Sequence, residues 1–130
     1  MNLNEECMSL LKSVADVDLN SVAFTNLVTV PPDKTMIVSH IVLRNLSATA
    51  ASAIATLGQS GDKDDFLAAQ TLSNINAAGK AAILQPIPNA TPVAIVEYTA
   101  SEIFGIDVTQ AAGSACTCTV DVFGYLIDAS

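Results

Sequence analysis

Tryptophan is absent from this chain of 130 residues, and tyrosine occurs only at Tyr98 and Tyr125. Sugar-binding sandwiches use flat aromatic side chains as stacking platforms, so this shortage counts against glycan recognition. Basic residues are also scarce: five lysines and arginines stand singly against 13 acidic residues, for a formal net charge of −8. Such a chain repels phosphate backbones and anionic lipid head groups. Neither nucleic acid nor a membrane surface is therefore expected as a partner.

Signatures of common catalytic and cofactor sites are missing as well. His40 is the single histidine, and it lies inside an apolar run with no carboxylate nearby in the sequence, which is a poor setting for a general base. No phosphate-binding loop or dinucleotide-binding fingerprint occurs. No apolar run reaches the ~20 residues of a membrane-spanning helix. We therefore expect a protein that is not an enzyme and that needs no cofactor.

The cysteines are three in number, Cys7, Cys116 and Cys118, and the chain starts with the acidic sequence MNLNEEC rather than a basic secretory signal. Both facts favour synthesis in a cytoplasm and reduced thiols. On an extended strand, Cys116 and Cys118 would lie about 6.6–7 Å apart on one face, which is poor geometry for a disulfide. One further cysteine and one histidine are too few for a zinc site. We expect buried, reduced thiols and no metal.

Two long apolar runs, 22–30 and 35–43, dominate the first third of the chain. Pro31 and Pro32 must end the first run, and Asp33 and Lys34 suit a turn, so the pair predicts a β-hairpin. The second run is mostly apolar on both faces. Such a strand is either central in a thick sandwich or covered on one side by another chain. The face expected to meet another copy carries Met36, Val38, His40 and Val42.

Before these runs, apolar residues recur at helical spacing in the first 16 residues. This spacing predicts a short amphipathic helix or an extended arm over residues 1–20, ahead of a domain over residues 21–130. A helix this short does not hold alone in water, so the segment must dock on its own domain or on a neighbouring subunit. Both alternatives stay open. Its interface candidates are Leu3, Cys7, Leu10, Leu11 and Val14.

Short strands are expected along the rest of the chain, at 48–57, 82–86, 91–99, 102–109 and 115–127. Residues 58–65 are expected as a polar loop whose aspartates lack the spacing of a calcium-binding loop. Residues 66–82 fit either a short helical turn or an irregular crossing. Alternation predicts that Phe104, Ile106 and Val108 face inward, and Gly124 marks a bulge or a close approach of two backbones. The pattern predicts an all-β antiparallel sandwich, with jelly-roll as the leading topology.

The segments TVPPDKTMIVSHIVLRN, EIFGIDV and TVDVFGYLI resemble small β-sandwich proteins of tailed bacteriophages, above all the decoration or cement proteins of icosahedral heads. The resemblance implies a jelly-roll-like virion protein on the capsid surface. It also implies self-association, commonly as a trimer, binding over junctions between major capsid proteins, and an N-terminal arm that reaches neighbours. None of these segments is a catalytic signature. The alternative is a phage head or tail fibre module that binds a host receptor or a glycan.

Overall fold

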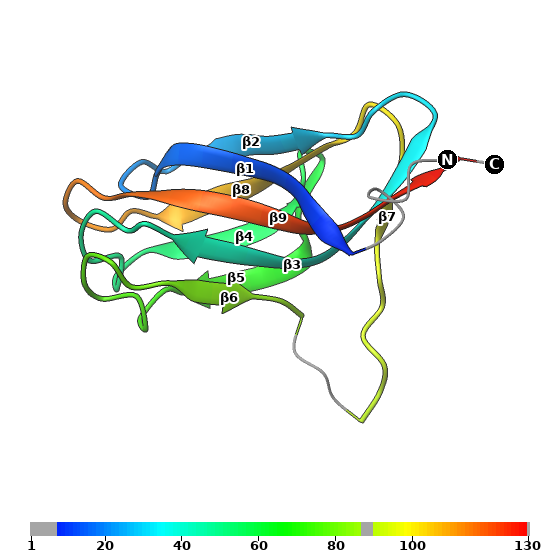
Figure 1. Ribbon diagram of the computed structural model, residues 1–130. Helices are drawn as coiled ribbons and strands as arrows, with labels where there is room; N and C mark the ends of the chain where they lie inside the picture. The colour runs from blue at the N-terminus through cyan, green and yellow to red at the C-terminus, as the bar shows by residue number, and fades with distance from the viewer. Residues whose placement is uncertain (1–7, 87–89, 130) are drawn as a thin grey trace.

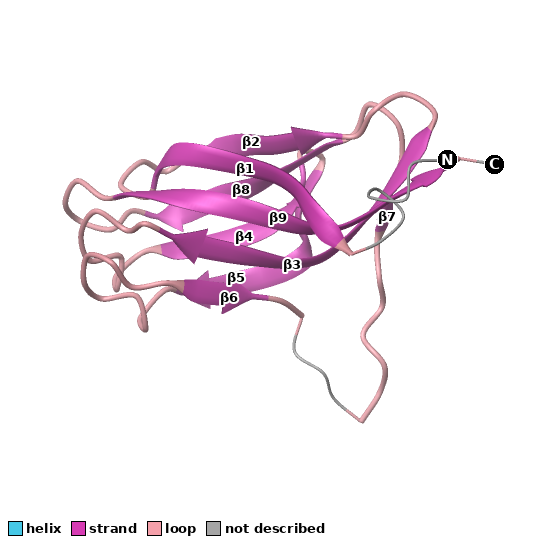
Figure 2. Cartoon of the chain, viewed as in Figure 1, coloured by secondary structure: helices cyan, strands magenta, loops and turns pink. Residues whose placement is uncertain are grey.

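The computed structural model describes residues 8–86 and 90–129, and these ranges contain nine β-strands and no helix (Figures 1 and 2). Accordingly, no helix in these ranges is long and apolar enough to cross a membrane. The strands are β1 (Ser9–Asp18), β2 (Phe24–Thr29), β3 (Lys34–Arg44), β4 (Ile54–Gln59), β5 (Asp62–Thr71), β6 (Ala82–Leu84), β7 (Glu97–Tyr98), β8 (Ile103–Gln110) and β9 (Thr117–Asp128).

These strands form two antiparallel sheets packed face to face (Figure 1). Sheet A has the order β1-β9-β3-β6, with the short β7 also paired to β3, and sheet B has the order β2-β8-β4-β5. The chain pairs like one long folded ribbon, since β1 pairs with β9, β2 with β8, β3 with β6 and β4 with β5. Successive pairs fall in opposite sheets, which is the jelly-roll arrangement. The predicted sandwich is confirmed.

The core lies between the sheets and is supplied mainly by β3, β8 and β9. Phe104, Ile106 and Val108 are all buried, which confirms the inward face predicted for β8. Gly124 on β9 lies so close to β3 that a Cβ atom there would fall 2.1 Å from the carbonyl oxygen of Ile37. The predicted close backbone approach is therefore present. The irregularity beside it lies on β3, between Val38 and His40.

The predicted hairpin of the two apolar runs is wrong. Strand β2 pairs with β8 in sheet B, whereas β3 pairs with β9 in sheet A, so the two runs lie in opposite layers. The link between them is a turn: the Lys34 N–H donates to the Pro31 carbonyl oxygen at 3.3 Å, and Asp33 has φ of 61°. A turn of this kind reverses the chain equally well within a sheet or from one sheet to the other. The prolines fixed the turn but not the pairing.

The predicted N-terminal helix is also wrong within the described residues, where the extended alternative holds. Ser9–Asp18 is an edge strand of sheet A, antiparallel to β9. Its pairing shifts register twice, between Leu10 and Lys12 and between Val14 and Val17, and these shifts break the two-residue period of a regular strand. Apolar residues spaced around such bulges imitate a helical pattern. Leu3 and Cys7 lie outside the described residues.

Four further expectations change in the middle of the chain. The expected polar loop 58–65 is a tight hairpin in which Ser60 and Gly61 connect β4 to β5. The strand expected at 48–57 begins only at Ile54. Of residues 66–82, the first six continue β5, and residues 72–81 form the irregular crossing, which leads from sheet B to β6 in sheet A. Of the strand expected at 91–99, only Glu97–Tyr98 is paired, and the preceding residues project away from the body of the sandwich (Figure 1).

Candidate interaction surface

The outer face of sheet A is shaped by a bulge in β3, where the register with β9 shifts between Val38 and His40. Before the bulge, Met36 and Val38 point into the core and are 0% and 5% exposed. After it, Ile41 and Leu43 take the inward positions. The bulge thus divides the face that the sequence predicted as one surface. The side chains of Met36 and Val38 belong to the core, with Val38 also lining a groove at one end of this face, while His40 and Val42 turn outward.

Cross-strand pairing then gathers apolar side chains on this outer face. His40 of β3 and Leu10 of β1 are both register partners of Phe123 on β9, and the rings of His40 and Phe123 stack with centroids 4.7 Å apart. Leu10 and Ile83 are 50% and 57% exposed. Neighbouring outward positions are also apolar. We call this surface the outer patch: Leu10, Ile37, His40, Val42, Ile83, Phe123 and Tyr125.

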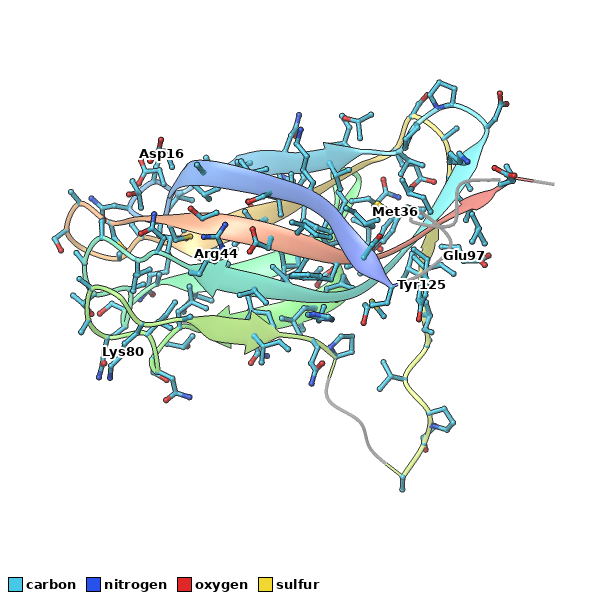
Figure 3. All side chains as sticks on the ribbon, in the orientation of Figure 1. Asp16, Met36, Arg44, Lys80, Glu97 and Tyr125 are labelled. Atoms are coloured by element: carbon cyan, nitrogen blue, oxygen red, sulfur yellow. The ribbon has the colours of Figure 1, made fainter. Side chains whose placement is uncertain are left out.

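A polar network borders the outer patch and ties three strands together. Asp121 of β9 accepts hydrogen bonds from Arg44 Nε of β3 at 2.7 Å and from Ser13 Oγ of β1 at 2.6 Å. Its carboxylate is almost fully covered. Burial by itself would raise the pKa of Asp121, but the hydrogen bonds from Arg44 and Ser13 and the attraction of the guanidinium outweigh it and lower that pKa. Arg44, which is labelled in Figure 3, and Asp121 therefore neutralise each other beside the patch.

At one end of the patch, residues 92–96 form one wall of a groove of about 440 Å³. The opposite wall comes from β3 and β9, through Ile37, Ser39 and Tyr125, with Asp65 and Phe66 of β5 at the side. The lining is mostly apolar. Figure 3 shows Tyr125 and Glu97 close to the point where the projecting segment rejoins the sandwich.

Tyr98 anchors the end of that segment between the two sheets. Its side chain is buried, it packs edge-on against Phe104, and its hydroxyl donates to Asp65 Oδ1 at 2.7 Å. Burial and then the hydrogen bond to Asp65 raise the pKa of Tyr98. The tyrosine therefore stays neutral and fixes the base of the projection.

Other residues singled out from the sequence lie away from the patch. Leu11 and Val14 are partly buried and pack against the core. Cys116 and Cys118 are free, buried thiols, and burial raises the pKa of Cys118 to about 12. Within residues 8–86 and 90–129, no group of three histidine, cysteine or acidic side chains is arranged to hold a metal ion. Sequence reasoning missed Ile83, Phe123 and Tyr125 as surface candidates, although alternation along β9 placed the last two opposite the inward residues.

Comparisons with known proteins bear on the fold. No protein-family model matches this sequence, and the curated proteins likewise gave no match. Among solved structures, a chain of the "Cyanophage Pam1 capsid asymmetric unit" is similar, with a TM-score of 0.50, 17% sequence identity, and coverage of 89% of this chain and 81% of that chain. The two chains share a fold. The coverage on both sides also means that they are similar in length.

Proposed function

We propose that this protein is a structural virion protein that decorates and stabilises the icosahedral capsid of a tailed phage. In this proposal it is made in the host cytoplasm, associates with itself as a trimer and sits on the capsid surface over junctions between major capsid proteins. The observation that carries the proposal is the outer patch, a contiguous apolar sheet face, because faces of this kind mark interaction sites. The fold shared with a phage capsid chain supports the same reading.

The chemistry of the surface supports binding rather than catalysis. Apart from His40, whose Nδ1 hydrogen-bonds with Ser39 Oγ, the patch consists of aliphatic and aromatic side chains, and the carboxylate at its border, Asp121, is already engaged by Arg44 and Ser13. In the groove, the carboxylate of Asp65 is occupied by the Tyr98 hydroxyl. A protein that binds the assembled shell better than free subunits stabilises the shell by mass action. Its effect is on an equilibrium and not on a chemical rate.

The groove favours a second candidate, a head or tail fibre module that binds a host receptor or a glycan. A sugar site needs polar groups placed to meet hydroxyls, together with an aromatic platform. The groove offers Ser39, an occupied Asp65 and the ring of Tyr125. This lining suits an apolar contact better than a sugar, so we place the fibre role second.

Shell binding and shell melting test the proposal. Wild-type protein is expected to sediment with capsid shells that lack it and to raise their melting temperature with concentration. Ile83→Asp places a charge in the exposed part of the patch and should weaken attachment while the isolated protein keeps its fold. Asn26→Asp, on the outer face of sheet B, is the matched control and should behave like wild type. A wild-type protein that does not bind shells refutes the capsid role.

A truncation tests the proposed arm, and the structure limits where it can end. Removing residues 1–16 would delete most of β1 and uncover β9, so it would damage the fold as well as the arm. Deletion of residues 1–7 leaves β1 intact. If the arm reaches neighbours, this shorter deletion should weaken shell attachment through lost multivalency while the melting temperature of the free protein stays unchanged. Equal attachment with and without these residues would exclude the arm as a clamp.

A further inference from the structure

Residues 91–96 are prone to form a strand but pair with no strand of their own chain. Their sequence, TPVAIV, is rich in β-branched residues, which favours extended, paired structure. The chain leaves the edge of β3 after Leu84 and rejoins it only at Glu97, so no pairing covers 91–96 in the described part of the chain. Val93 and Ile95 are 41% and 69% exposed. An apolar, strand-prone segment is thus presented to the surroundings.

The outer patch is left uncovered by the same chain. Leu10 and Ile83 remain about half exposed with the projection in place, so the projection does not cover them. In Figure 1 the projection leaves the sandwich at one end and extends away from the sheet. Ile37 and Tyr125, at one end of the patch, face residues 92–96 across the groove, whereas Leu10 and Ile83 on the patch and Val93 and Ile95 on the projection keep exposed side chains.

Charge indicates which partner can join these two surfaces. Copies of a chain with a net charge of −8 repel each other, except where the contact surfaces carry little charge. Residues 90–96 contain no ionisable side chain. Beside the patch, Arg44 and Asp121 neutralise each other, and Glu97 stands only at its margin. These surfaces are where two copies can approach without bringing unpaired carboxylates together.

We infer that residues 91–96 of one copy lie on the outer patch of a second copy of this chain. The contact joins two different surfaces, so it is heterologous, and its repetition gives a ring when the rotation between copies closes and a filament when it does not. The inference rests on one part of the proposed function, the self-association, and names the contact through which the copies would associate. Several copies held together would engage a repetitive shell at several points at once.

Cysteine cross-linking of free protein, without shells, tests this contact. In a Cys7→Ser background the remaining native thiols are Cys116 and Cys118, which are buried. Ile95→Cys is mixed with either Ile83→Cys or Leu10→Cys, oxidised mildly and run on a denaturing gel without reductant. A linked pair is expected in at least one mixture. Val22→Cys is the matched control, because Val22 is 65% exposed but lies between β1 and β2, off the patch, and its mixture with Ile95→Cys should stay unlinked.

The outcomes separate this inference from the capsid role. A link in a patch mixture but not in the control supports it, and Ile95→Asp should then lower the mass in sedimentation to that of one chain while Val22→Asp leaves it unchanged. Absence of a link at both patch positions overturns the inference, as does a wild-type protein that stays monomeric at high concentration. A monomer that still binds shells would overturn only this contact. An oligomer that binds no shell would overturn only the capsid role.

Discussion

The two outer faces of the sandwich differ in how their apolar side chains are covered. On sheet B, the ring of Phe24 lies over Gly105, where a Cβ atom would fall 2.5 Å from a ring carbon. Lys63 Nζ stands 5.6 Å from the centre of that ring. Asp107 of β8, the register partner of Phe24, occupies the adjoining outward position. Sheet B thus covers its exposed aromatic ring with groups of its own chain.

On sheet A, the outward apolar side chains away from the groove have no such cover. Phe123 stacks on His40, but Leu10 and Ile83 end in solvent. Jelly-roll topology alone would make the two faces equivalent. Single exposed apolar residues are ordinary on any protein, whereas a contiguous group on one face and a polar surface on the other are informative. The contrast supports the proposal that sheet A carries the binding surface.

The largest effect is expected from Gly124→Ala, which attacks the framework of sheet A. The new Cβ atom would lie 2.1 Å from the Ile37 carbonyl oxygen, and backbone cannot move aside as a side chain can. We expect a loss of about 3 kcal/mol or more in the free energy of unfolding, measured by chemical denaturation. Gly105→Ala should have a similar effect on sheet B, where the Thr25 carbonyl oxygen lies 2.3 Å from the added atom.

Gly61→Ala is the control for both glycine substitutions. Its nearest neighbour is the end of the Gln59 side chain at 3.4 Å, so stability should stay within about 0.5 kcal/mol of wild type. If Gly124→Ala were as mild as Gly61→Ala, the pairing of β9 with β3, and with it the outer patch, would be wrong.

A smaller loss is expected from Tyr98→Phe, which cuts the hydrogen bond that joins the two sheets at the projection. The substitution keeps the packing against Phe104 but removes the donor to Asp65, which costs about 1–3 kcal/mol when the acceptor is charged. Tyr125→Phe removes a hydroxyl from the outer patch instead and should be nearly neutral. Thermal unfolding of both variants provides the measurement. Equal stabilities would mean that Asp65 does not anchor Tyr98.

Sequence periodicity was reliable where strands are regular. Alternation in β8 placed Phe104, Ile106 and Val108 in the core, because each position of a regular strand fixes the next. It failed in β3, because one extra residue near Ser39 exchanges the side chains that point inward with those that point outward. A serine at this position does not by itself predict a bulge. Met36 and Val38 were thus placed on the wrong face, whereas the interface role of His40 and Val42 stays a prediction.

The pairing of strands that are distant in the sequence was the other feature that the sequence did not predict. Pro31 and Pro32 marked a chain reversal, but a reversal within a sheet and one between sheets have the same local sequence. The pairing of β2 with β8 depends on residues about eighty positions further along the chain, which local patterns do not register. Likewise, the β-branched sequence 91–96 predicted a strand, but of the expected strand 91–99 only Glu97–Tyr98 is paired. A partner strand for residues 91–96 is absent from the described part of their own chain.

The smallest effect is expected in the pH dependence of stability, at the polar border of sheet A. Hydrogen bonding to Arg44 and Ser13 lowers the pKa of Asp121 in the folded chain despite its burial. The resulting stabilisation is complete above the unfolded-state pKa of about 3.9 and is lost as the pH falls from there through the lower folded pKa. The stability of the Asp121→Asn variant should therefore decrease less steeply than that of wild type as the pH falls over that interval.

Asp107→Asn isolates the contribution of the ion pair in this experiment. Asp107 is the outward carboxylate of β8 on sheet B, and no ion pair is recorded for it among the described residues. Denaturation midpoints between pH 2 and 5 for wild type and both variants separate the loss of a carboxylate from the loss of the Arg44 partner. A steeper acid response in wild type than in Asp121→Asn, with Asp107→Asn close to wild type, is the expected result. If the midpoints of all three proteins changed in parallel with pH, Asp121 would not be paired with Arg44. The description of a charge-neutral border beside the outer patch would then be wrong.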